Sequence, residues 1–351
     1  MKVGIVGYPG VGKSAVFAAL TGSDGADASG GRRLAVAEVA DKRLDVLRQA
    51  FAPKKFTRAR FEVEDGLVLP SSSGRGSGEA ISALREPDAL IVTVGIFEQA
   101  LMVLDEPFHE PAAQLQSFLD ELLLLDLEAL EGRVGRLRER LDRGAGDRAE
   151  SERELAFLER LIVLVEGRQV PADRTDRTHA RILAELGLLT EKPVIPVLNV
   201  DESDLSRHAE SREWAGSNGL GEVLSAPVES EISLLDDEDR RAFLADYGLE
   251  SPASVRLTRL AYEALDLISF FTVGDDEVRA WPIARGSTAV EAAGKIHTDL
   301  ARGFIRAEAT AFEDVSHVKD GREFKAAAAT ELRGKDYVVE DGDILNIRFS
   351  I

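Results

Sequence analysis

Near its start the chain reads Gly7-Tyr8-Pro9-Gly10-Val11-Gly12-Lys13-Ser14, which matches the pattern G-x-x-x-x-G-K-[ST] in full. An apolar segment at 2–6 precedes this stretch and a helix-like pattern at 15–21 follows it. In such a loop the glycines let main-chain N–H groups converge on phosphate oxygens, Lys13 reaches the β- and γ-phosphates, and the Ser14 hydroxyl coordinates Mg²⁺. The order strand, loop, helix therefore predicts a phosphate-binding loop for a nucleotide.

Apolar segments further along the chain alternate with helix-like patterns. We interpret 34–40, 61–69, 89–97 and 194–200 as strands and 42–51 as a helix. Alternating strands and helices are typical of a parallel sheet with helices on both faces. We therefore predict an α/β fold with a parallel-rich sheet around the phosphate loop.

The segment from 112 to 167 has a different composition, rich in Leu, Glu and Arg and free of proline. Its apolar residues Leu155, Leu158, Ile162 and Val165 recur at coiled-coil spacing. The break at Gly144-Ala145-Gly146 divides it in two. We predict an inserted antiparallel helical hairpin.

The C-terminal part returns to an alternation of apolar and polar residues, which indicates a small β-rich α+β domain. A helix is expected at 289–297, behind Ser287-Thr288 as its cap. The strands are expected at 277–283, 305–312, 337–339 and 344–349.

The composition of the chain excludes several classes of protein. It has 43 Lys+Arg against 63 Asp+Glu, a formal net charge of −20, and no cysteine, which excludes disulfides, thiol nucleophiles and thiolate metal sites. The five histidines show no metal-ligand spacing. No apolar run approaches the roughly 20 residues that cross a bilayer, and the N-terminus lacks the pattern of a signal peptide. We expect a cytoplasmic monomer without membrane or DNA partners.

A second motif follows the predicted strand at 194–200, where the chain reads Asn199-Val200-Asp201-Glu202. GTPases place Asn-Lys-x-Asp here, and the Asp accepts two hydrogen bonds from guanine. Glu202 holds that place and Val200 replaces the Lys, so we expect weaker selectivity for guanine. Leu224-Ser225-Ala226 matches the short loop that closes over the base. The predicted base-binding residues are Asn199, Val200, Glu202, Ser225 and Ala226.

With these motifs the sequence resembles the YchF-type, Obg-like ATPases, a branch of the translation-factor GTPase class with an Asn-x-x-Glu base motif. The resemblance spans nearly the whole chain. It is strongest in the C-terminal part, which is similar to the TGS domain of that family through Phe270-Phe271-Thr272, Val278-Arg279-Ala280-Trp281, Ile296-His297-Thr298-Asp299, Gly303-Phe304-Ile305-Arg306-Ala307-Glu308 and Gly334-Lys335-Asp336-Tyr337.

The resemblance implies three parts. A P-loop nucleotide-binding domain at 1–111 and 190–267 is interrupted by the helical hairpin at 112–189, and a TGS-like β-grasp domain follows at 268–351. The resemblance also implies binding of ATP in preference to GTP, and association with ribosomes.

The catalytic motifs depart from the pattern of that family. Gly66 matches the Gly of Asp-x-x-Gly, but Val63 stands where the Asp would hold Mg²⁺ through water. Glu62 and Glu64 flank it, and strand alternation points both away from the metal, while Asp65 is two residues out of register.

Two further functional residues of the family pattern are missing from this sequence. The stretch from Gly22 to Arg33 contains no Thr to act as a metal ligand, and the catalytic His of the family aligns near Leu104. We expect His109, five residues later, to cap or pair locally. Of the groups that manage Mg²⁺ only Ser14 remains, so we predict a nucleotide binder with weak or lost hydrolysis. The alternative is an active ATP hydrolase in which Asp65 or Glu64 substitutes.

A stripe of arginines on the first hairpin helix offers a surface for ribosomal RNA. Four side chains fall within an arc of about 80° at helical spacing: Arg133, Arg136, Arg140 and Arg143. The alternative is a solvated face paired with nearby glutamates. Two other functions remain open, an RNA-binding scaffold without nucleotide dependence and a P-loop small-molecule kinase, but the kinase leaves the Asn199 motif without a role.

Overall fold

The structure, a computed structural model, describes residues 1–23, 26–27, 31–70, 77–144, 147–169, 176–205, 221–327 and 329–350. The chain forms two compact units. The first comprises 1–18, 24–34 and 63–243, and the second comprises 19–23, 35–62 and 244–351.

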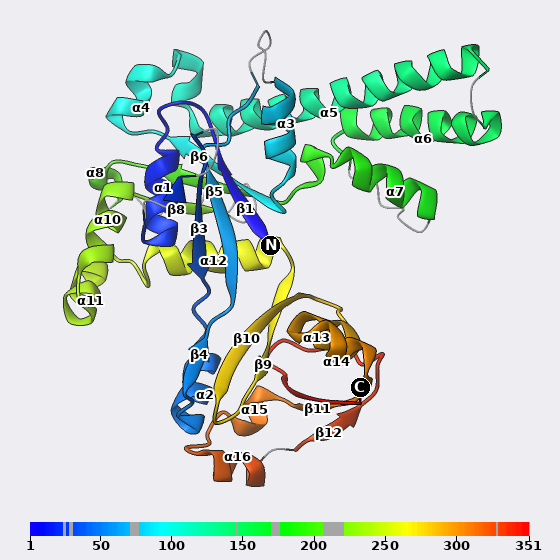
Figure 1. Ribbon diagram of the computed structural model, residues 1–351. Coiled ribbons are helices and arrows are strands. Elements are labelled where there is room, and N and C mark those ends of the chain that lie inside the picture. Colours follow the sequence, from blue (N-terminus) through cyan, green and yellow to red (C-terminus); the bar gives the residue numbers. More distant parts are fainter. Residues whose placement is uncertain are drawn as a thin grey trace. The chain divides into compact units, whose positions relative to one another are not determined.

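The larger sheet belongs mainly to the first unit (Figure 1). Within the described residues its strand order is β2-β3-β5-β1-β6-β7-β8, and β1, β6, β7 and β8 pair in parallel. β6 is buried along its whole length, as a central strand covered on both faces must be. The strands are β1 (Lys2–Val6), β2 (Ala26–Asp27), β3 (Arg33–Glu38), β5 (Arg60–Asp65), β6 (Ala89–Gly95), β7 (Val194–Asn199) and β8 (Glu222–Leu224).

Helices alternate with these strands along the chain in the first unit. They are α1 (Lys13–Thr21), α3 (Ser77–Arg85), α4 (Glu98–Val103), η2 (Glu106–His109), α5 (Pro111–Asp142), α6 (Arg148–Glu166), α7 (Arg177–Leu186), η3 (Leu189–Glu191), α8 (Glu202–Leu205), α10 (Ala226–Leu234) and α11 (Asp237–Asp246). The mixed α/β fold with a parallel-rich sheet is thus confirmed.

The predicted helical hairpin corresponds to α5 and α6, which lie side by side (Figure 1). Leu130 and Leu137 of α5 and Leu158 of α6 belong to one buried core, which Ile182 of α7 completes. α5 ends at Asp142, two residues before the predicted break at Gly144. Ala145 and Gly146 lie outside the described residues. α7, whose apolar face closes the core of the hairpin, was not predicted from the sequence.

The second unit contains the smaller sheet, with strand order β12-β11-β13-β9-β10-β4 within the described residues. Its strands are β4 (Lys55–Thr57), β9 (Leu267–Thr272), β10 (Glu277–Ala284), β11 (Phe304–Thr310), β12 (Glu331–Arg333) and β13 (Ile344–Phe349). Its helices are α2 (Lys42–Phe51), α12 (Ala253–Ala264), α13 (Ala289–Ile296), α14 (Thr298–Arg302), α15 (Phe312–Val315) and α16 (Gly321–Ala327).

The helix predicted at 289–297 is confirmed as α13, and Thr288 forms a capping box with Glu291 at its start. The strand predicted at 337–339 is wrong. Val338 makes a single bridge to Thr288, because this segment covers the start of α13 instead of joining the sheet.

β9 was missed by the sequence analysis. Its run Leu-Ile-Ser-Phe-Phe-Thr is apolar on both faces and therefore lacks the alternation of a half-exposed strand. Phe270 and Phe271 point to opposite faces and are both fully buried. Among the described residues, no helix is both long and apolar enough to span a membrane.

Candidate nucleotide-binding site

The phosphate loop connects β1 to α1, as the motif predicts. Gly12 has a φ of +89°, and a Cβ added there would lie 2.3 Å from Nδ2 of Asn199. An L-residue would therefore meet both a strained backbone and a collision. The glycine lets β7 approach the loop, so the two sequence motifs meet at this residue.

Lys13 folds over the loop that precedes it. Its Nζ donates hydrogen bonds to the main-chain oxygens of Gly7 at 3.0 Å and Tyr8 at 2.8 Å. Burial lowers the pKa of Lys13 below its usual value, and the negative charge of Asp65 opposes this shift. The ammonium group is thus placed at the centre of the loop, where a phosphate oxygen can replace a carbonyl as its partner.

Ser14, at the first turn of α1, contacts the end of β5. Its Oγ donates a hydrogen bond to Oδ2 of Asp65 at 2.9 Å, and Asp65 is almost fully buried. The same carboxylate oxygen forms an ion pair with Nη2 of Arg33. A carboxylate therefore lies beside Ser14, although the sequence places the family Asp at Val63.

This contact corrects the expectation that Ser14 alone remains of the metal-supporting groups. Side chains along a strand alternate between faces, so Val63 and Asp65 share one face and Asp65 reaches Ser14 without a register shift. Glu64 points to the other face, where its carboxylate pairs with Lys2 at 3.1 Å and with Arg32 at 3.1 Å. Glu62 is exposed. The alternation thus directs Glu64 away from Ser14, as predicted.

β5 ends at Asp65, four residues before the predicted strand end, because Gly66 turns the chain with a φ of +86°. A Cβ at Gly66 would lie 2.6 Å from the main-chain oxygen of Gly31. The glycine thus allows the segment before β3 to approach the end of β5. This close approach brings Arg33 to Asp65.

A cavity of about 330 Å³ adjoins the phosphate loop. Its lining consists of Gly7, Tyr8, Pro9, Lys13, Val68, Leu69, Pro70 and Glu121. The sequence analysis missed Glu121, since no local motif marks this residue of α5. The cavity joins the loop, the segment that follows Gly66, and the start of the hairpin.

Tyr8 anchors the phosphate loop to α5. Its Oη donates a hydrogen bond to Oγ of Ser117 at 2.8 Å. Its ring lies against Phe108 and Phe118, with centroids at 5.1 and 6.0 Å. The contact was not predictable from local sequence, because 109 positions separate the two hydroxyls.

On the base side, Asn199 connects three segments from a buried position at the end of β7. Its Nδ2 donates to the main-chain oxygen of Val11 at 3.2 Å, and its Oδ1 accepts from the main-chain N–H of Ala226 at 3.1 Å. The phosphate loop, the Asn199 motif and the Ser225-Ala226 loop are therefore assembled in one place. Sequence spacing alone suggested this association.

The other predicted base-binding residues differ in exposure. Glu202 is exposed at the start of α8, whereas the side chain of Val200 is buried and presents little surface to a base. Ser225 is also buried, and within the described part of the chain its Oγ has no hydrogen-bond partner. Leaving a buried hydroxyl without a partner costs about 1–3 kcal/mol.

His109 makes a local contact, as expected from the sequence. Its Nε2 lies 3.1 Å from the main-chain oxygen of Leu101 and 3.2 Å from that of Leu104. One ring N–H between two carbonyl oxygens closes the segment that joins α4 to α5. The histidine therefore has a structural explanation.

The arginine stripe on α5 is divided between two environments. Arg133 and Arg140, one heptad apart, reach across to the neighbouring helices. Arg133 pairs with Glu154 at 2.6 Å and with Glu185 at 3.0 Å, and Arg140 donates to Oγ of Ser151 at 2.7 Å.

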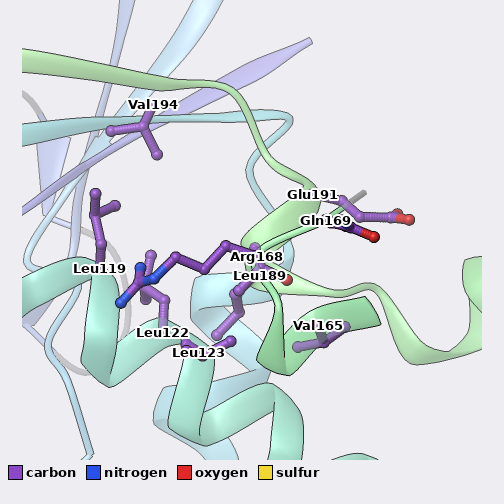
Figure 2. A pocket seen from close by; sticks show the side chains of 10 residues that line it. Leu119, Leu122, Leu123, Val165, Arg168, Gln169, Leu189, Glu191 and Val194 are labelled. Carbon is purple, nitrogen blue, oxygen red and sulfur yellow. The ribbon is translucent and has the colours of Figure 1, made fainter. Parts of the chain in front are cut away.

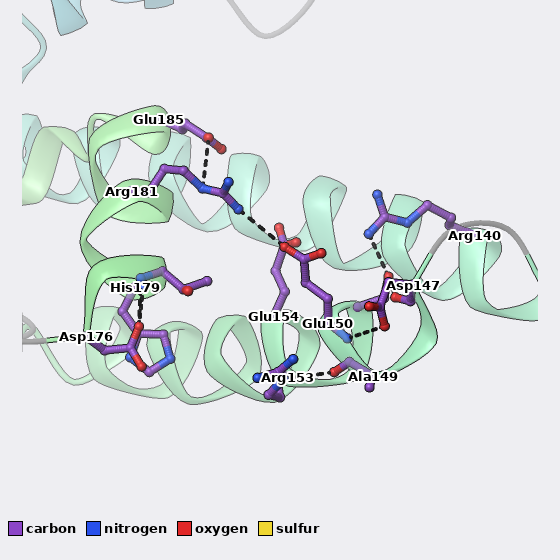
Figure 3. Close-up of polar contacts among 12 residues, drawn as sticks. Arg140, Asp147, Ala149, Glu150, Arg153, Glu154, Asp176, His179, Arg181 and Glu185 are labelled. Carbon is purple, nitrogen blue, oxygen red and sulfur yellow. Dashed lines mark hydrogen bonds and ion pairs between the residues drawn. The ribbon is translucent and has the colours of Figure 1, made fainter.

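Figure 3 shows the polar contacts around Arg140 and the ion pair between Arg181 and Glu150 that joins α7 to α6. Arg136, Arg140 and Arg143 are all exposed, and Arg143 pairs with Glu139 on its own helix. The stripe is thus not one uniform basic surface.

A second cavity, of about 160 Å³, shares no lining residue with the first. Leu119, Leu122 and Leu123 of α5 form one wall, and Val165 and Arg168 come from the end of α6 and the residues after it (Figure 2). Arg168 pairs with Asp120. The wall is mainly apolar, so this cavity does not fit a phosphate.

Comparison with known proteins identifies the family. The family model YchF-GTPase_C, described as "Protein of unknown function (DUF933)", matches residues 267–350. Over the full chain, the sequence is 36% identical to the ribosome-binding ATPase YchF of Haemophilus ducreyi, and the alignment covers 99% of that protein. The chain belongs to the YchF family.

Other YchF proteins and a solved structure agree with this assignment. The ribosome-binding ATPase YchF of Bacillus subtilis is 34% identical, and each chain is covered completely. The structure of the Schizosaccharomyces pombe YchF GTPase has a TM-score of 0.81 and 31% identity, and the match covers 99% of this chain and 97% of the other. The resemblance inferred from the motifs is confirmed.

Proposed function

We propose that the protein is an ATP-preferring, nucleotide-binding switch protein that associates with ribosomes and hydrolyses ATP weakly. The observation that carries the proposal is the position of Asn199, which bonds both Val11 and Ala226. This side chain couples the loop that would hold the phosphates to the loop that would hold the base. A loop that no longer bound a nucleotide would not require both contacts.

The preference for ATP rests on Glu202. In the GTPase motif an Asp at this place accepts two hydrogen bonds from guanine, and a longer carboxylate displaces the acceptor oxygens. Glu202 is exposed, so its carboxylate is placed to meet a ligand instead of the core. The buried Oγ of Ser225 supplies a second polar group for the base or ribose.

Calorimetric titration with ATP, GTP and their diphosphates tests this proposal. We expect ATP to bind more tightly than GTP, because Glu202 replaces the guanine-selective Asp. GTP binding about tenfold tighter than ATP, a difference of about 1.4 kcal/mol, would overturn the argument from Glu202. If neither nucleotide binds, the protein is a scaffold without nucleotide dependence.

Weak hydrolysis is proposed because groups that support the metal and the attacking water are replaced. Val63 is fully buried and offers no oxygen, and Leu104 stands at the place of the family His. The second candidate, an active ATP hydrolase, is favoured by the contact between Ser14 and Asp65. Single-turnover hydrolysis of ATP with Mg²⁺ separates the two: a rate near that of an intact family member supports the active enzyme.

Association with ribosomes is proposed from the relatives, which are named ribosome-binding ATPase YchF. We propose a TGS-like β-grasp domain at 268–351 and a hairpin at 112–189 as the parts that meet the ribosome, in a cytoplasmic monomer. Within the arginine stripe, Arg136, Arg140 and Arg143 are exposed, but Arg140 is bonded to Ser151, so Arg136 and Arg143 are the residues proposed to contact rRNA.

Co-sedimentation with ribosomes tests the association. We expect the wild-type chain to pellet with ribosomes more strongly with ATP than without it, and Lys13→Ala to lose this difference. Replacing Arg136 and Arg143 together with Gln should weaken co-sedimentation and reduce its dependence on salt. Association that is unchanged by Lys13→Ala and by nucleotide would support the scaffold.

A further inference from the structure

Two neighbouring arginines, Arg32 and Arg33, form ion pairs on opposite faces of β5. Arg32 pairs with Glu64 at 3.1 Å, on the face away from the phosphate loop. Arg33 pairs with Asp65, whose Oδ2 also accepts the hydrogen bond of Ser14. Of the two arginines, Arg33 therefore belongs to the cluster that it forms with Ser14 and Asp65 at the start of α1.

Arg33 is held in this place by more than one contact. Its guanidinium carbon lies 5.2 Å from the ring centroid of Phe17, one turn of α1 beyond Ser14. About a quarter of the Arg33 side chain is exposed, whereas Asp65 is nearly inaccessible. The guanidinium group thus lies along the first turn of α1, beside the nearly buried Asp65.

The same cluster carries the charges that a metal ion would meet. The serine hydroxyl and the aspartate carboxylate are oxygen groups of the kind that Mg²⁺ prefers. Oδ2 of Asp65, however, already accepts from both Ser14 and Arg33. A divalent ion bound to this oxygen would lie beside a guanidinium group that is always positively charged. The residues present therefore do not fit a metal ion while Arg33 keeps this position.

We propose that Arg33 is a phosphate-binding residue that supplies, from within the chain, the positive charge that a metal ion supplies in related sites. Together with Lys13 it gives two fixed cations around Asp65. Nucleotide phosphates then bind with little dependence on Mg²⁺. The proposal rests on the proposed function, since it requires that the loop binds a nucleotide.

The test is calorimetric titration of the full chain with ATP, in excess Mg²⁺ and in excess EDTA. For the wild-type chain we expect the two dissociation constants to differ by less than about threefold. For Arg33→Gln we expect affinity in EDTA to fall by about tenfold or more, because a charge-assisted hydrogen bond is lost. Added Mg²⁺ should restore most of that loss, since Asp65 and Ser14 are then released for a metal.

Two further variants control the experiment. Arg32→Gln removes the same charge one position away, and Lys2 still pairs with Glu64, so its ATP affinity should match that of the wild type. Arg33→Lys keeps the charge and should recover part of the affinity in EDTA. Thermal unfolding of each variant checks that it folds.

The outcomes separate this inference from the proposed function. If the wild-type chain binds ATP and Arg33→Gln binds it equally in EDTA, Arg33 is not a phosphate ligand and the proposed function stands. The role of Arg33 would also be overturned if ATP binding by the wild-type chain depended on Mg²⁺ as strongly as ATP binding by the Arg33→Gln variant does. Absence of ATP binding by the wild-type chain under both conditions would overturn the inference and the proposed function together.

Discussion

The phosphate loop at residues 7–14 and the end of β5 at residues 63–66 meet at Ser14, but their structures depend on different features. The loop depends on main-chain geometry, with Gly12 in the left-handed region against Asn199. The end of β5 depends on side-chain charges, chiefly those of Asp65 and Arg33.

This difference explains why one region matches its motif and the other does not. A position that needs glycine has no substitute, because every other side chain adds atoms where the backbone of another segment must pass. A charge can be supplied from a neighbouring position on the same face of a strand. Replacement of the family Asp by Val63 is thus accompanied by Asp65 at the same face.

The largest effect is expected for Gly12→Ala. The added Cβ would displace Asn199, and the backbone strain of a left-handed residue adds about 1–2 kcal/mol. We expect the free energy of unfolding to fall by about 3 kcal/mol in total, with one or two hydrogen bonds lost, and ATP binding to disappear. Chemical denaturation and calorimetry measure the two effects.

Gly22→Ala is the matched control for that variant. Gly22 also has a positive φ, of +66°, but a Cβ there would meet nothing within 4 Å. The difference between the two variants therefore reports the contact with Asn199 alone. Equal destabilisation would show that this contact is not what requires the glycine.

Lys13→Ala tests the charge at the centre of the loop. Loss of a charge-assisted contact of up to about 3 kcal/mol predicts ATP affinity about 100-fold weaker in calorimetry. Lys54→Ala serves as control, because Lys54 is exposed and pairs with Asp276 far along the chain. A fall of less than about threefold for Lys13→Ala would argue against phosphate binding by the loop.

Ser225→Ala separates binding from stability on the base side. Removing a buried hydroxyl without a partner should leave the free energy of unfolding unchanged or raise it by up to about 1 kcal/mol. Affinity for ATP should fall by about fivefold, corresponding to one neutral hydrogen bond. Unchanged affinity would remove Ser225 from the base site.

The smallest effect is expected for Asp65→Asn, measured by single-turnover hydrolysis of ATP with Mg²⁺. Since hydrolysis is proposed to be weak already, its rate should change by less than about twofold. A fall of about 100-fold would instead show that Asp65 supports catalysis and would identify an active hydrolase. This variant therefore decides whether the end of β5 has only an electrostatic role.

The parts of the site that could be predicted from sequence are those with local signatures. The loop at 7–14 follows from its motif, and the meeting of Asn199 with Ala226 follows from the order of known motifs. The hairpin follows from composition and from its glycine break. In each case a recognisable motif or a local change of composition marks the residues that determine the feature.

The rest depends on contacts between distant segments. The approach of Arg33 to Asp65 requires the turn at Gly66, and the anchoring of Tyr8 by Ser117 requires the packing of α5. β9 escaped prediction because a central strand buried on both faces has no alternation. None of these features has a signature in its own segment.

The central claim is that the loop binds ATP in preference to GTP and does so without a metal ion. The most direct measurement is the affinity of the wild-type chain for ATP and GTP by calorimetry, with Mg²⁺ and with EDTA. We predict tighter binding of ATP than of GTP, with equal ATP affinity in both conditions. Tighter binding of GTP, or ATP binding that vanishes in EDTA, would contradict the claim.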